Sequence, residues 1–258
     1  MAWLDLSRLQ RQLRTEELGR RLIYYTSVGS TQDVARREAD AGAPEGTLVL
    51  ADEQTAGRGR LGRAWASPPG QNLYLTLVLR PPLAALKRLT MVAPLAVARA
   101  VAETTGLQVG IKWPNDVWVG RRKLSGVLLE SEVQGDSVRY CLLGIGVNVN
   151  MDVAAVPELA DIATSLRREL GREVSREEVL ASLLNHLEVL YRGACRGEPV
   201  LEEWRARLIT LGQEVTVRFG QQVEEGLAED VDEEGRLLLR RRDGSRIAIE
   251  AGDVTLRG

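Results

Sequence analysis

The sequence has few of the residues that build disulfide frameworks, metal clusters or histidine-dependent active sites. Its 258 residues include two cysteines, Cys141 and Cys195, and one histidine, His186. The cysteines form no C-x-x-C pair, which excludes a disulfide framework and a zinc ribbon and fits a reducing compartment. A His-rich metal site cannot be built, and Ser–His or Cys–His catalysis would depend on His186 alone. The helical apolar spacing around His186 predicts a helix residue at the edge of the core.

Long apolar segments and a strong net charge are also missing. The longest apolar stretch, residues 91–102, is interrupted by Pro94 and Arg99 and is shorter than the roughly 18 residues that a membrane span needs. The N-terminus is charged and has no apolar secretory region. We therefore predict a cytoplasmic protein with no membrane partner. With 34 basic and 36 acidic residues the net charge is −2, which removes the broad positive field that non-specific nucleic-acid binding needs.

What is present predicts an α+β protein with a mixed or antiparallel sheet. The spacing of apolar residues favours helices over 4–18, 31–41, 83–105 (bent or restarted at Pro94), 176–196 and 199–208, and strands within 22–26, 47–52, 72–79 and 107–150. The helices after residue 175 should cover one face of the sheet. Past Gly212, short alternating strands with turns every eight to twelve residues predict a small β-barrel or sandwich. We expect one domain over residues 1–210 and a second over 211–258.

Lysine is unusually scarce, because 31 of the 34 basic residues are arginine and only Lys87, Lys112 and Lys123 are lysine. Lys112 and Lys123 flank a predicted hairpin, so they can come close enough to share one anionic ligand, for which a compact ammonium is suited. The alternative is two solvated lysines at strand ends. Their rarity favours a function.

A glycine–arginine loop, Gly57-Arg-Gly-Arg-Leu-Gly-Arg63, formally satisfies G-x-G-x-x-G. A dinucleotide site requires a helix to start inside the motif, whereas SPPG and a strand follow here, so a Rossmann site is disfavoured. The loop is either an anion cradle, with arginine forks for phosphate or carboxylate, or an exposed basic loop, and alone it supports both equally.

The segment Lys112-Trp-Pro-Asn-Asp-Val-Trp118 ends a predicted strand in a tight connection. Asn115 and Asp116 should project from this connection. Asp116 either caps the turn or lies near a magnesium ion carried by a nucleotide. Trp113 and Trp118 are better explained as core residues.

Taken together and in order, the segments S-T-Q, D-E-Q-T-A-G-R-G-R-x-G-R-x-W, K-W-P-N-D, R-K-L-S-G and G-I-G-V-N-V-N resemble biotin protein ligases, which join biotin to biotin-dependent carboxylases. The resemblance runs from about Leu4 through the terminal β-domain and is strongest between Ser30 and Asn150. It implies a synthetase-like catalytic domain followed by an SH3-like barrel, with biotin and ATP as substrates, Mg²⁺, and a biotin carboxyl carrier protein of acetyl-CoA carboxylase as partner. It leaves a homodimer open.

The resemblance also implies roles for individual residues. Biotin binding falls to Ser30, Thr31, Gln32, Gln54, Gly57, Arg58, Gly59, Arg60, Lys123 and Gly126. ATP binding falls to Arg58, Arg60, Arg63, Trp65, Lys112, Asn115, Asp116, Lys123 and Asn148, with Asp116 on the magnesium side. The catalytic residues are Lys123, Arg60 and Lys112. Adenylate formation and transfer need positioning and positive charge, and no enzyme nucleophile or histidine, which agrees with their scarcity.

Two residues and the N-terminus depart from the family pattern. Gln32 replaces a common asparagine, and Leu61 stands where a polar residue is frequent. Bifunctional members carry a winged helix-turn-helix domain for which the residues before Ile23 leave no room, so we expect no DNA-binding repressor activity. Alternatives are a lipoate or octanoate ligase of the same superfamily and, in another class, a nucleic-acid-binding regulator. The R-G-R and K-W-P-N-D segments jointly favour biotin. Net charge and an acidic tail, with seven basic against eleven acidic residues over 211–258, argue against the regulator.

Overall fold

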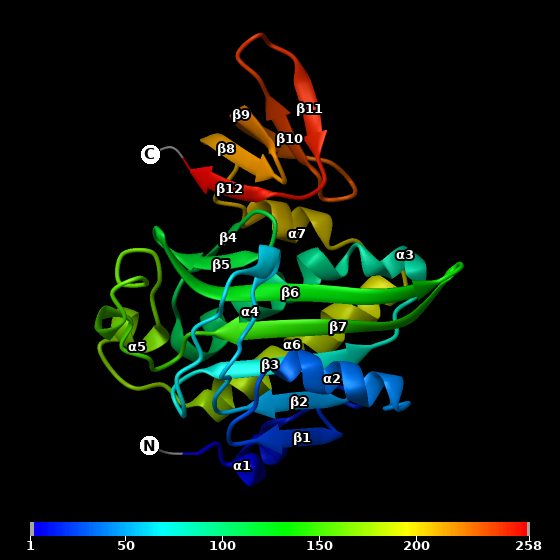
Figure 1. Cartoon of the computed structure of the whole chain (residues 1–258), viewed down its shortest axis with the longest axis vertical. Helices are drawn as coiled ribbons and strands as arrows, with labels where there is room; N and C mark the ends of the chain where they lie inside the picture. Colours follow the sequence, from blue (N-terminus) through cyan, green and yellow to red (C-terminus); the bar gives the residue numbers. More distant parts are fainter. Residues whose placement is uncertain (1–2, 257–258) are drawn as a thin grey trace.

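The computed structural model describes residues 3–256 and arranges them in two β-sheets with seven α-helices (Figure 1). The large sheet contains β1 (Leu22–Tyr25), β2 (Leu48–Ala51), β3 (Leu73–Leu79), β4 (Gly110–Lys112), β5 (Asp116–Val119), β6 (Arg122–Gln134) and β7 (Ser137–Val147). The small sheet contains β8 (Glu214–Phe219), β9 (Gln222–Val231), β10 (Leu237–Arg240), β11 (Arg246–Ile249) and β12 (Asp253–Leu256). The helices are α1 (Leu6–Gln12), α2 (Thr31–Asp40), α3 (Leu83–Leu86), α4 (Leu89–Thr105), α5 (Leu166–Leu170), α6 (Arg176–Cys195) and α7 (Leu201–Ala206).

The large sheet has the order β1-β2-β3-β7-β6-β5-β4, and its β1–β2 pair is parallel while its other pairs are antiparallel. The prediction of an α+β fold with a mixed sheet is therefore confirmed. Both faces of the sheet centre are covered, which explains why β2 and β3 are buried at every position and read as continuous apolar runs.

Helices cover the two faces unequally. On one face, α4 and α6 pack against each other and against leucines such as Leu50, Leu75 and Leu77 in the main core. On the other face, α2 packs Val34 and Ala35 onto a smaller cluster from β2, β3 and β7. Figure 1 shows α2 in front of the sheet and α4 and α6 behind it. This division leaves the N-terminus of α2 against the middle of β3 and β7, where the candidate site lies.

Helix ends follow the expected capping chemistry. The Ser30 side chain accepts a hydrogen bond from the Gln32 N–H and starts α2, and Ser175 accepts from the Glu178 N–H and starts α6. Gly106 ends α4 with φ 75°, in the left-handed region that favours glycine. These predicted boundaries are confirmed.

Two helix predictions are wrong in detail. The N-terminal helix spans only Leu6–Gln12 and not residues 4–18, because the chain turns extended at Leu13. The helix over 83–105 is interrupted at Lys87 and Arg88 and not at Pro94, which lies inside α4. At the interruption the N–H groups of Thr90 and Met91 bond three residues back, and the Thr90 hydroxyl also donates to the Lys87 carbonyl.

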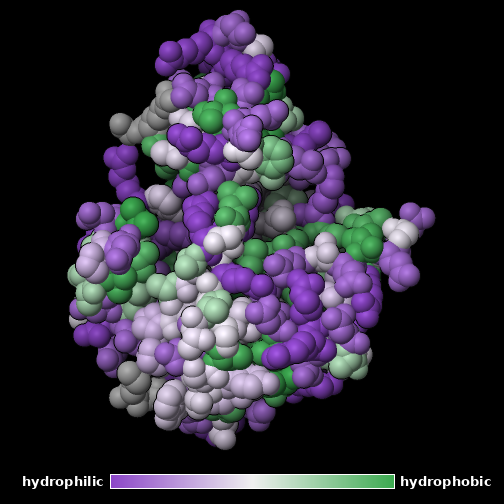
Figure 2. All heavy atoms as spheres, viewed as in Figure 1, coloured by the Kyte–Doolittle hydropathy of each residue, from purple (hydrophilic) through white to green (hydrophobic). Residues whose placement is uncertain are grey.

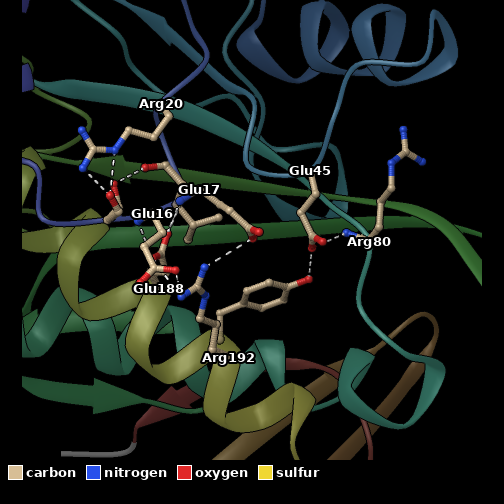
Figure 3. Close-up of polar contacts among 10 residues, drawn as sticks. Glu16, Glu17, Arg20, Glu45, Arg80, Glu188 and Arg192 are labelled. Atoms are coloured by element: carbon tan, nitrogen blue, oxygen red, sulfur yellow. Dashed lines mark hydrogen bonds and ion pairs between the residues drawn. The ribbon is translucent and has the colours of Figure 1, made fainter.

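The chain after Leu13 is not helical, because α6 supplies its hydrogen-bond partner (Figure 3). The Glu188 carboxylate accepts the backbone N–H groups of Glu16, Glu17 and Leu18 at 2.7, 2.9 and 2.8 Å, and Arg192 lies 3.7 Å from it. Burial alone would raise the pKa of the Glu188 carboxyl, but these three amides and Arg192 outweigh burial and lower it. A carboxylate on α6, far along the chain, thus fixes the N-terminal segment.

Replacing this carboxylate should destabilise the protein. For Glu188→Ala we expect a loss of about 3 kcal/mol of unfolding free energy at pH 7, because one buried and two partly buried N–H groups lose a charged acceptor. Since the folded-state pKa lies below the ordinary value of 4.5, the contribution is complete above that value and is lost as pH falls through the folded pKa. Urea unfolding of both proteins between pH 7 and 3 measures this. A difference that stays constant down to pH 3 would contradict the carboxylate's role.

The small sheet is antiparallel with the order β11-β10-β9-β8-β12, which agrees with an SH3-like barrel. It lies beside the β4 edge of the large sheet (Figure 1). Ile111 and Ile209 pair their backbones here, and the Trp113 indole N–H donates to the Gly235 carbonyl at 2.9 Å. A division into domains at residues 210 and 211 stays a prediction.

Among residues 3–256, every helix is too short or too polar to cross a membrane.

Candidate active site

A cavity of about 230 Å³ lies between the large sheet, the loop at residues 54–66 and the turn before β12. Figure 2 shows the surface hollowed between the small sheet, at the top, and the large sheet below it. Every predicted site residue except Gly57 lines the cavity: Ser30, Thr31, Gln32, Gln54, Arg58, Gly59, Arg60, Arg63, Trp65, Lys112, Asn115, Asp116, Lys123, Gly126 and Asn148. Segments far apart in the sequence therefore meet in one recess.

One end of the cavity carries neutral hydrogen-bonding groups. At the start of α2, the Thr31 N–H and hydroxyl both donate to Gln54 Oε1, at 2.9 and 3.0 Å. The Thr76 hydroxyl on β3 lies 2.9 Å from the Thr31 hydroxyl and 3.0 Å from Gln32 Oε1. All of these groups except Gln54 are buried. Such an end suits an uncharged ligand that both donates and accepts hydrogen bonds.

Gln32 is accommodated by a glycine on the neighbouring strand. Its amide Nε2 donates to the Leu142 carbonyl at 3.3 Å, and its Oε1 would lie 2.7 Å from a Cβ atom at Gly144. A side chain at position 144 would therefore collide with the glutamine. The long side chain that replaces the family's asparagine is thus fitted into a gap that Gly144 leaves open.

Each arginine of the glycine–arginine loop has a polar partner. Arg58 lies 2.6 Å from Asp33, Arg60 donates to Asn115 Oδ1 at 2.8 Å, and Arg63 lies 3.0 Å from Asp253. The loop contains a single 3₁₀ turn, Arg60–Gly62, and then leads to β3, so no helix starts in the motif. This agrees with the rejection of a dinucleotide site.

Two loop positions depend on backbone geometry. Gly57 does not line the cavity; a Cβ atom there would lie 2.5 Å from the Trp65 carbonyl oxygen and 2.8 Å from Ser67 Oγ. The structure therefore gives Gly57 a packing role inside the loop, in place of the predicted ligand contact. Leu61 is two-thirds exposed and has φ 58°, a conformation that is strained for a branched side chain.

The opposite end of the cavity is cationic. Lys112 ends β4, Lys123 lies on β6, and Asp116 begins β5 between these strands. Lys123 Nζ is 2.8 Å from Asp116 Oδ1, and Lys112 Nζ lies 4.6 Å above the Trp118 ring. Burial lowers the pKa of Lys112, and Asp116 opposes this shift. The two ammonium groups therefore face one region, as the spacing predicted.

The tryptophans differ in their surroundings. Trp113 is buried in the main core, as predicted. Trp118 lies outside the core clusters, and the prediction of a core residue is wrong for it because its ring supports Lys112.

Trp65 packs on the backbone of β6 and β7 where glycines leave room. Cβ atoms at Gly146 and Gly126 would lie 2.5 and 3.0 Å from the indole, and Lys123 Nζ is 5.3 Å from the ring centre. The indole N–H is buried and has no hydrogen-bond partner among residues 3–256. A buried donor at a cavity wall is available to a ligand acceptor.

Asn115 and Asn148 are held rigidly. Asn115 Nδ2 donates to the Val127 carbonyl while its Oδ1 accepts from Arg60. Asn148 follows β7, and its Nδ2 donates to the Thr164 carbonyl at 3.0 Å.

Sequence reasoning missed several lining residues. Gly252 and Asp253 come from the small sheet, and Leu159, Ile162 and Ala163 from the segment before α5. The Lys123 backbone bonds to this segment on both sides, accepting from Thr164 and donating to Ile162, at 2.9 Å each. Thr76, Gly144 and Gly146 also line the cavity. The alternating glycines of G-I-G-V-N indicate that other side chains approach this strand closely. The remaining missed residues carried no signal in the sequence.

The carboxylates of the cavity were tested as a metal site. Within residues 3–256 there is no group of three or more His, Cys, Asp or Glu residues that could hold a metal ion. Asp116 is one carboxylate beside the cationic end and pairs with Lys123. It fits a Mg²⁺ ion that arrives on a nucleotide, for which one protein carboxylate suffices, and does not fit a resident metal centre.

The arrangement can bring two anions together. Five cationic side chains, Arg58, Arg60, Arg63, Lys112 and Lys123, border the cavity next to a neutral polar end. A ligand with a polar ring and a carboxylate tail would place the tail among these cations, where a phosphate can also bind.

Comparison with known proteins identifies relatives along the whole chain. The Biotin/lipoate A/B protein ligase family matches residues 24–148, and the Biotin protein ligase C terminal domain matches residues 210–257. The chain is 38% identical over 258 residues to the bifunctional ligase/repressor BirA of Bacillus subtilis, covering 98% of this chain and 79% of that protein. It is 35% identical to the biotin–[acetyl-CoA-carboxylase] ligase of Mycobacterium tuberculosis, covering 95% and 94%.

A solved structure agrees with both matches. Biotin protein ligase from Aquifex aeolicus in complex with biotin and ATP superposes with a TM-score of 0.78 at 32% identity, covering 92% of this chain and 99% of that one. The fold, the two matched segments in order and the similarity over nearly the full length establish that this chain belongs to the biotin protein ligase family of enzymes.

Proposed function

We propose that this protein uses ATP to convert biotin to biotinyl-5′-AMP and then transfers biotin to a lysine of a biotin carboxyl carrier protein of acetyl-CoA carboxylase. The observation that carries the proposal is the cavity itself, which joins a neutral hydrogen-bonding end to a cationic end. The names of the relatives, a biotin–[acetyl-CoA-carboxylase] ligase and a ligase solved with biotin and ATP, support it.

The neutral end matches the ureido ring of biotin. A urea both donates and accepts hydrogen bonds, and Thr31, Gln54 and Gln32 offer both kinds of group. The dithiolane of lipoate and the alkyl chain of octanoate contain no strong hydrogen-bond donor or acceptor. The side chains at the neutral end are paired with one another or with the backbone in the structure. An apolar ligand end cannot share hydrogen bonds with them as a urea can, so its affinity for this end is lower. The geometry therefore favours biotin over the lipoate and octanoate alternative.

The cationic end suits adenylate formation. A biotin carboxylate oxygen attacks the α-phosphorus of ATP, the P–O bond to the β-phosphate breaks, and diphosphate leaves. Lys123 would bridge the carboxylate and α-phosphate oxygens, with Arg58 on the biotin side and Arg60 and Lys112 on the phosphate side. Their charges reduce the repulsion of the two anions and stabilise the charge that develops. When bound with ATP, Mg²⁺ would neutralise further phosphate charge, and Asp116 and Asn115 are the residues placed to hold it.

The transfer of biotin to the acceptor lysine requires no covalent bond to an enzyme side chain. The acceptor lysine nitrogen attacks the biotinyl carbonyl carbon, the bond to the AMP oxygen breaks, and AMP leaves with a proton released from the amine. The enzyme then acts by holding the mixed anhydride in place.

One assay tests the proposal against its nearest rival. We expect the protein, ATP and Mg²⁺ to label a carrier domain with biotin at least 10³-fold faster than with lipoate or octanoate, because a site built to hydrogen-bond its substrate rejects analogues that lack those groups. Intact-mass measurement of the carrier reports all three labels. Equal labelling with lipoate would contradict the assignment of biotin.

Two further expectations from the sequence stay predictions. Net charge −2 and the aspartate partners of Arg58 and Arg63 argue against nucleic-acid binding. Gel shifts with biotin-operon DNA, with and without biotin and ATP, test the absence of repressor activity. Ligand-dependent, sequence-selective binding would show that the chain is also a regulator.

A further inference from the structure

A buried polar network lies directly behind the cavity and centres on Asn72, which precedes β3. Asn72 has no exposed surface and does not line the cavity. Its Oδ1 accepts the N–H groups of Val149 and Met151 at 2.9 and 3.3 Å. Its Nδ2 lies 3.0 Å from Met151 Sδ and 3.5 Å from Asn148 Oδ1. One side-chain oxygen thus shapes the backbone turn immediately after Asn148.

The turn shaped by Asn72 supports the cationic end of the cavity through a second layer. Asn148 Nδ2 donates to the Thr164 carbonyl, and the Ser165 hydroxyl donates to the Met151 carbonyl at 2.8 Å. Thr164 in turn donates its N–H to the Lys123 carbonyl at 2.9 Å. Contacts therefore run without a break from Asn72 to Asn148 and to the backbone of Lys123.

Asn72 is also connected, through its backbone carbonyl, to residues that lie behind the biotin end of the cavity. Arg176, at the start of α6, donates to the Asn72 carbonyl at 3.2 Å and to the Asp52 carboxylate. Tyr24 donates to the other Asp52 oxygen. Asp52 is fully buried and lies two residues before Gln54. This connection uses the Asn72 backbone, so a substitution of its side chain leaves it in place.

We propose that Asn72 is a positioning residue of the nucleotide end of the cavity, acting through its side-chain oxygen on the 149–151 turn and so on Asn148 and Lys123. The inference deepens the proposed function and rests on it, because it assigns the end that Asn148 lines to ATP. Burying an amide is costly unless it is hydrogen-bonded, and here its acceptor is used twice on one turn. Biotin affinity should be insensitive to the Asn72 side chain. The connection to Asp52 runs through Arg176, which binds the backbone carbonyl of Asn72.

Three variants separate positioning from general stability. Asn72→Ala removes the acceptor. Asn72→Asp keeps an acceptor for the two N–H groups and removes the donor. Asn150→Ala is the matched control, because the Asn150 amide binds the backbone of Val174 at 2.8 and 2.9 Å in the same turn but does not line the cavity. For each variant, diphosphate release gives the KM for ATP and kcat, calorimetry without ATP gives the Kd for biotin, and thermal unfolding gives Tm.

We expect Asn72→Ala to raise the KM for ATP at least tenfold with a biotin Kd within twofold of the wild type. Asn72→Asp should recover most of that loss, and Asn150→Ala should lower Tm comparably while leaving both substrate constants within twofold. Parallel losses in ATP and biotin, an Asp variant no better than Ala, or an Asn150 variant with the same ATP defect would each overturn the proposal. A wild-type enzyme without biotin-dependent diphosphate release would instead refute the proposed function.

Discussion

Lys123→Ala should retain the fold and lose adenylate formation by a factor of about 10²–10³. The lysine lies between the loop tryptophan and a carboxylate at the cavity wall, 5.3 Å from the Trp65 ring centre and 2.8 Å from Asp116. Removing a positioned charge that stabilises the transition state costs about as much as removing an oxyanion-hole donor. Biotin-dependent diphosphate release, measured at saturating ATP, reports this step before any carrier is needed.

Two further variants show whether the effect depends on the charge and the position of Lys123. Lys123→Arg keeps the charge but replaces a compact ammonium by a planar fork, so partial activity is expected. Lys87→Ala is the control for loss of a lysine, because Lys87 pairs with Glu234 and Glu250 on the surface and does not line the cavity. An alanine variant at 123 with wild-type diphosphate release would show that this side chain does not act on the reacting groups.

Spacing and residue type were sufficient to predict most of the fold and the approach of Lys112 to Lys123, whereas the meeting of the other site segments was implied by the family resemblance. The capping serines Ser30 and Ser175 mark the starts of α2 and α6, and Gly106 marks the end of α4. These signals are local, since each depends on hydrogen bonds within one turn of helix. The gathering of Lys112 and Lys123 followed from a predicted hairpin, which is also a local feature.

The features that sequence reasoning missed depend on partners distant in the chain. Residues 13–18 have helical spacing but form no helix, because Glu188 takes the N–H groups of residues 16–18 from more than 160 residues away. Asp253 lines the cavity because the small sheet lies beside Arg63, and the sequence of an acidic tail gave no sign of it. Gly57 was assigned a ligand contact by analogy, whereas its neighbours in space show a requirement for loop packing.

Gly146→Ala should abolish most of the activity while leaving biotin bound. A Cβ atom at position 146 would lie 2.5 Å from Trp65 Cε2 and 2.6 Å from its Nε1, and the rigid indole cannot yield as a flexible chain could. The indole, and with it the loop that carries Arg60 and Arg63, must shift. A displacement of about 1 Å in a positioned group can cost about 10²-fold in rate. We therefore expect a loss of about that size in diphosphate release. The loss of affinity for biotin should be smaller, because Arg58 lies on the shifted loop but Thr31 and Gln32 lie on α2.

Two glycine controls make the argument quantitative. At Gly126 a Cβ atom would meet Trp65 at 3.0 Å and the flexible end of Lys123 at 3.1 Å, so alanine there should cost less than at Gly146. At Gly29 a Cβ atom meets nothing within 4 Å, so Gly29→Ala should retain wild-type activity. Tryptophan fluorescence reports whether Trp65 has moved. If Gly146→Ala retains full activity, or if Gly126→Ala is the more damaging change, the docking of Trp65 on β7 is not what orders the arginine loop for catalysis.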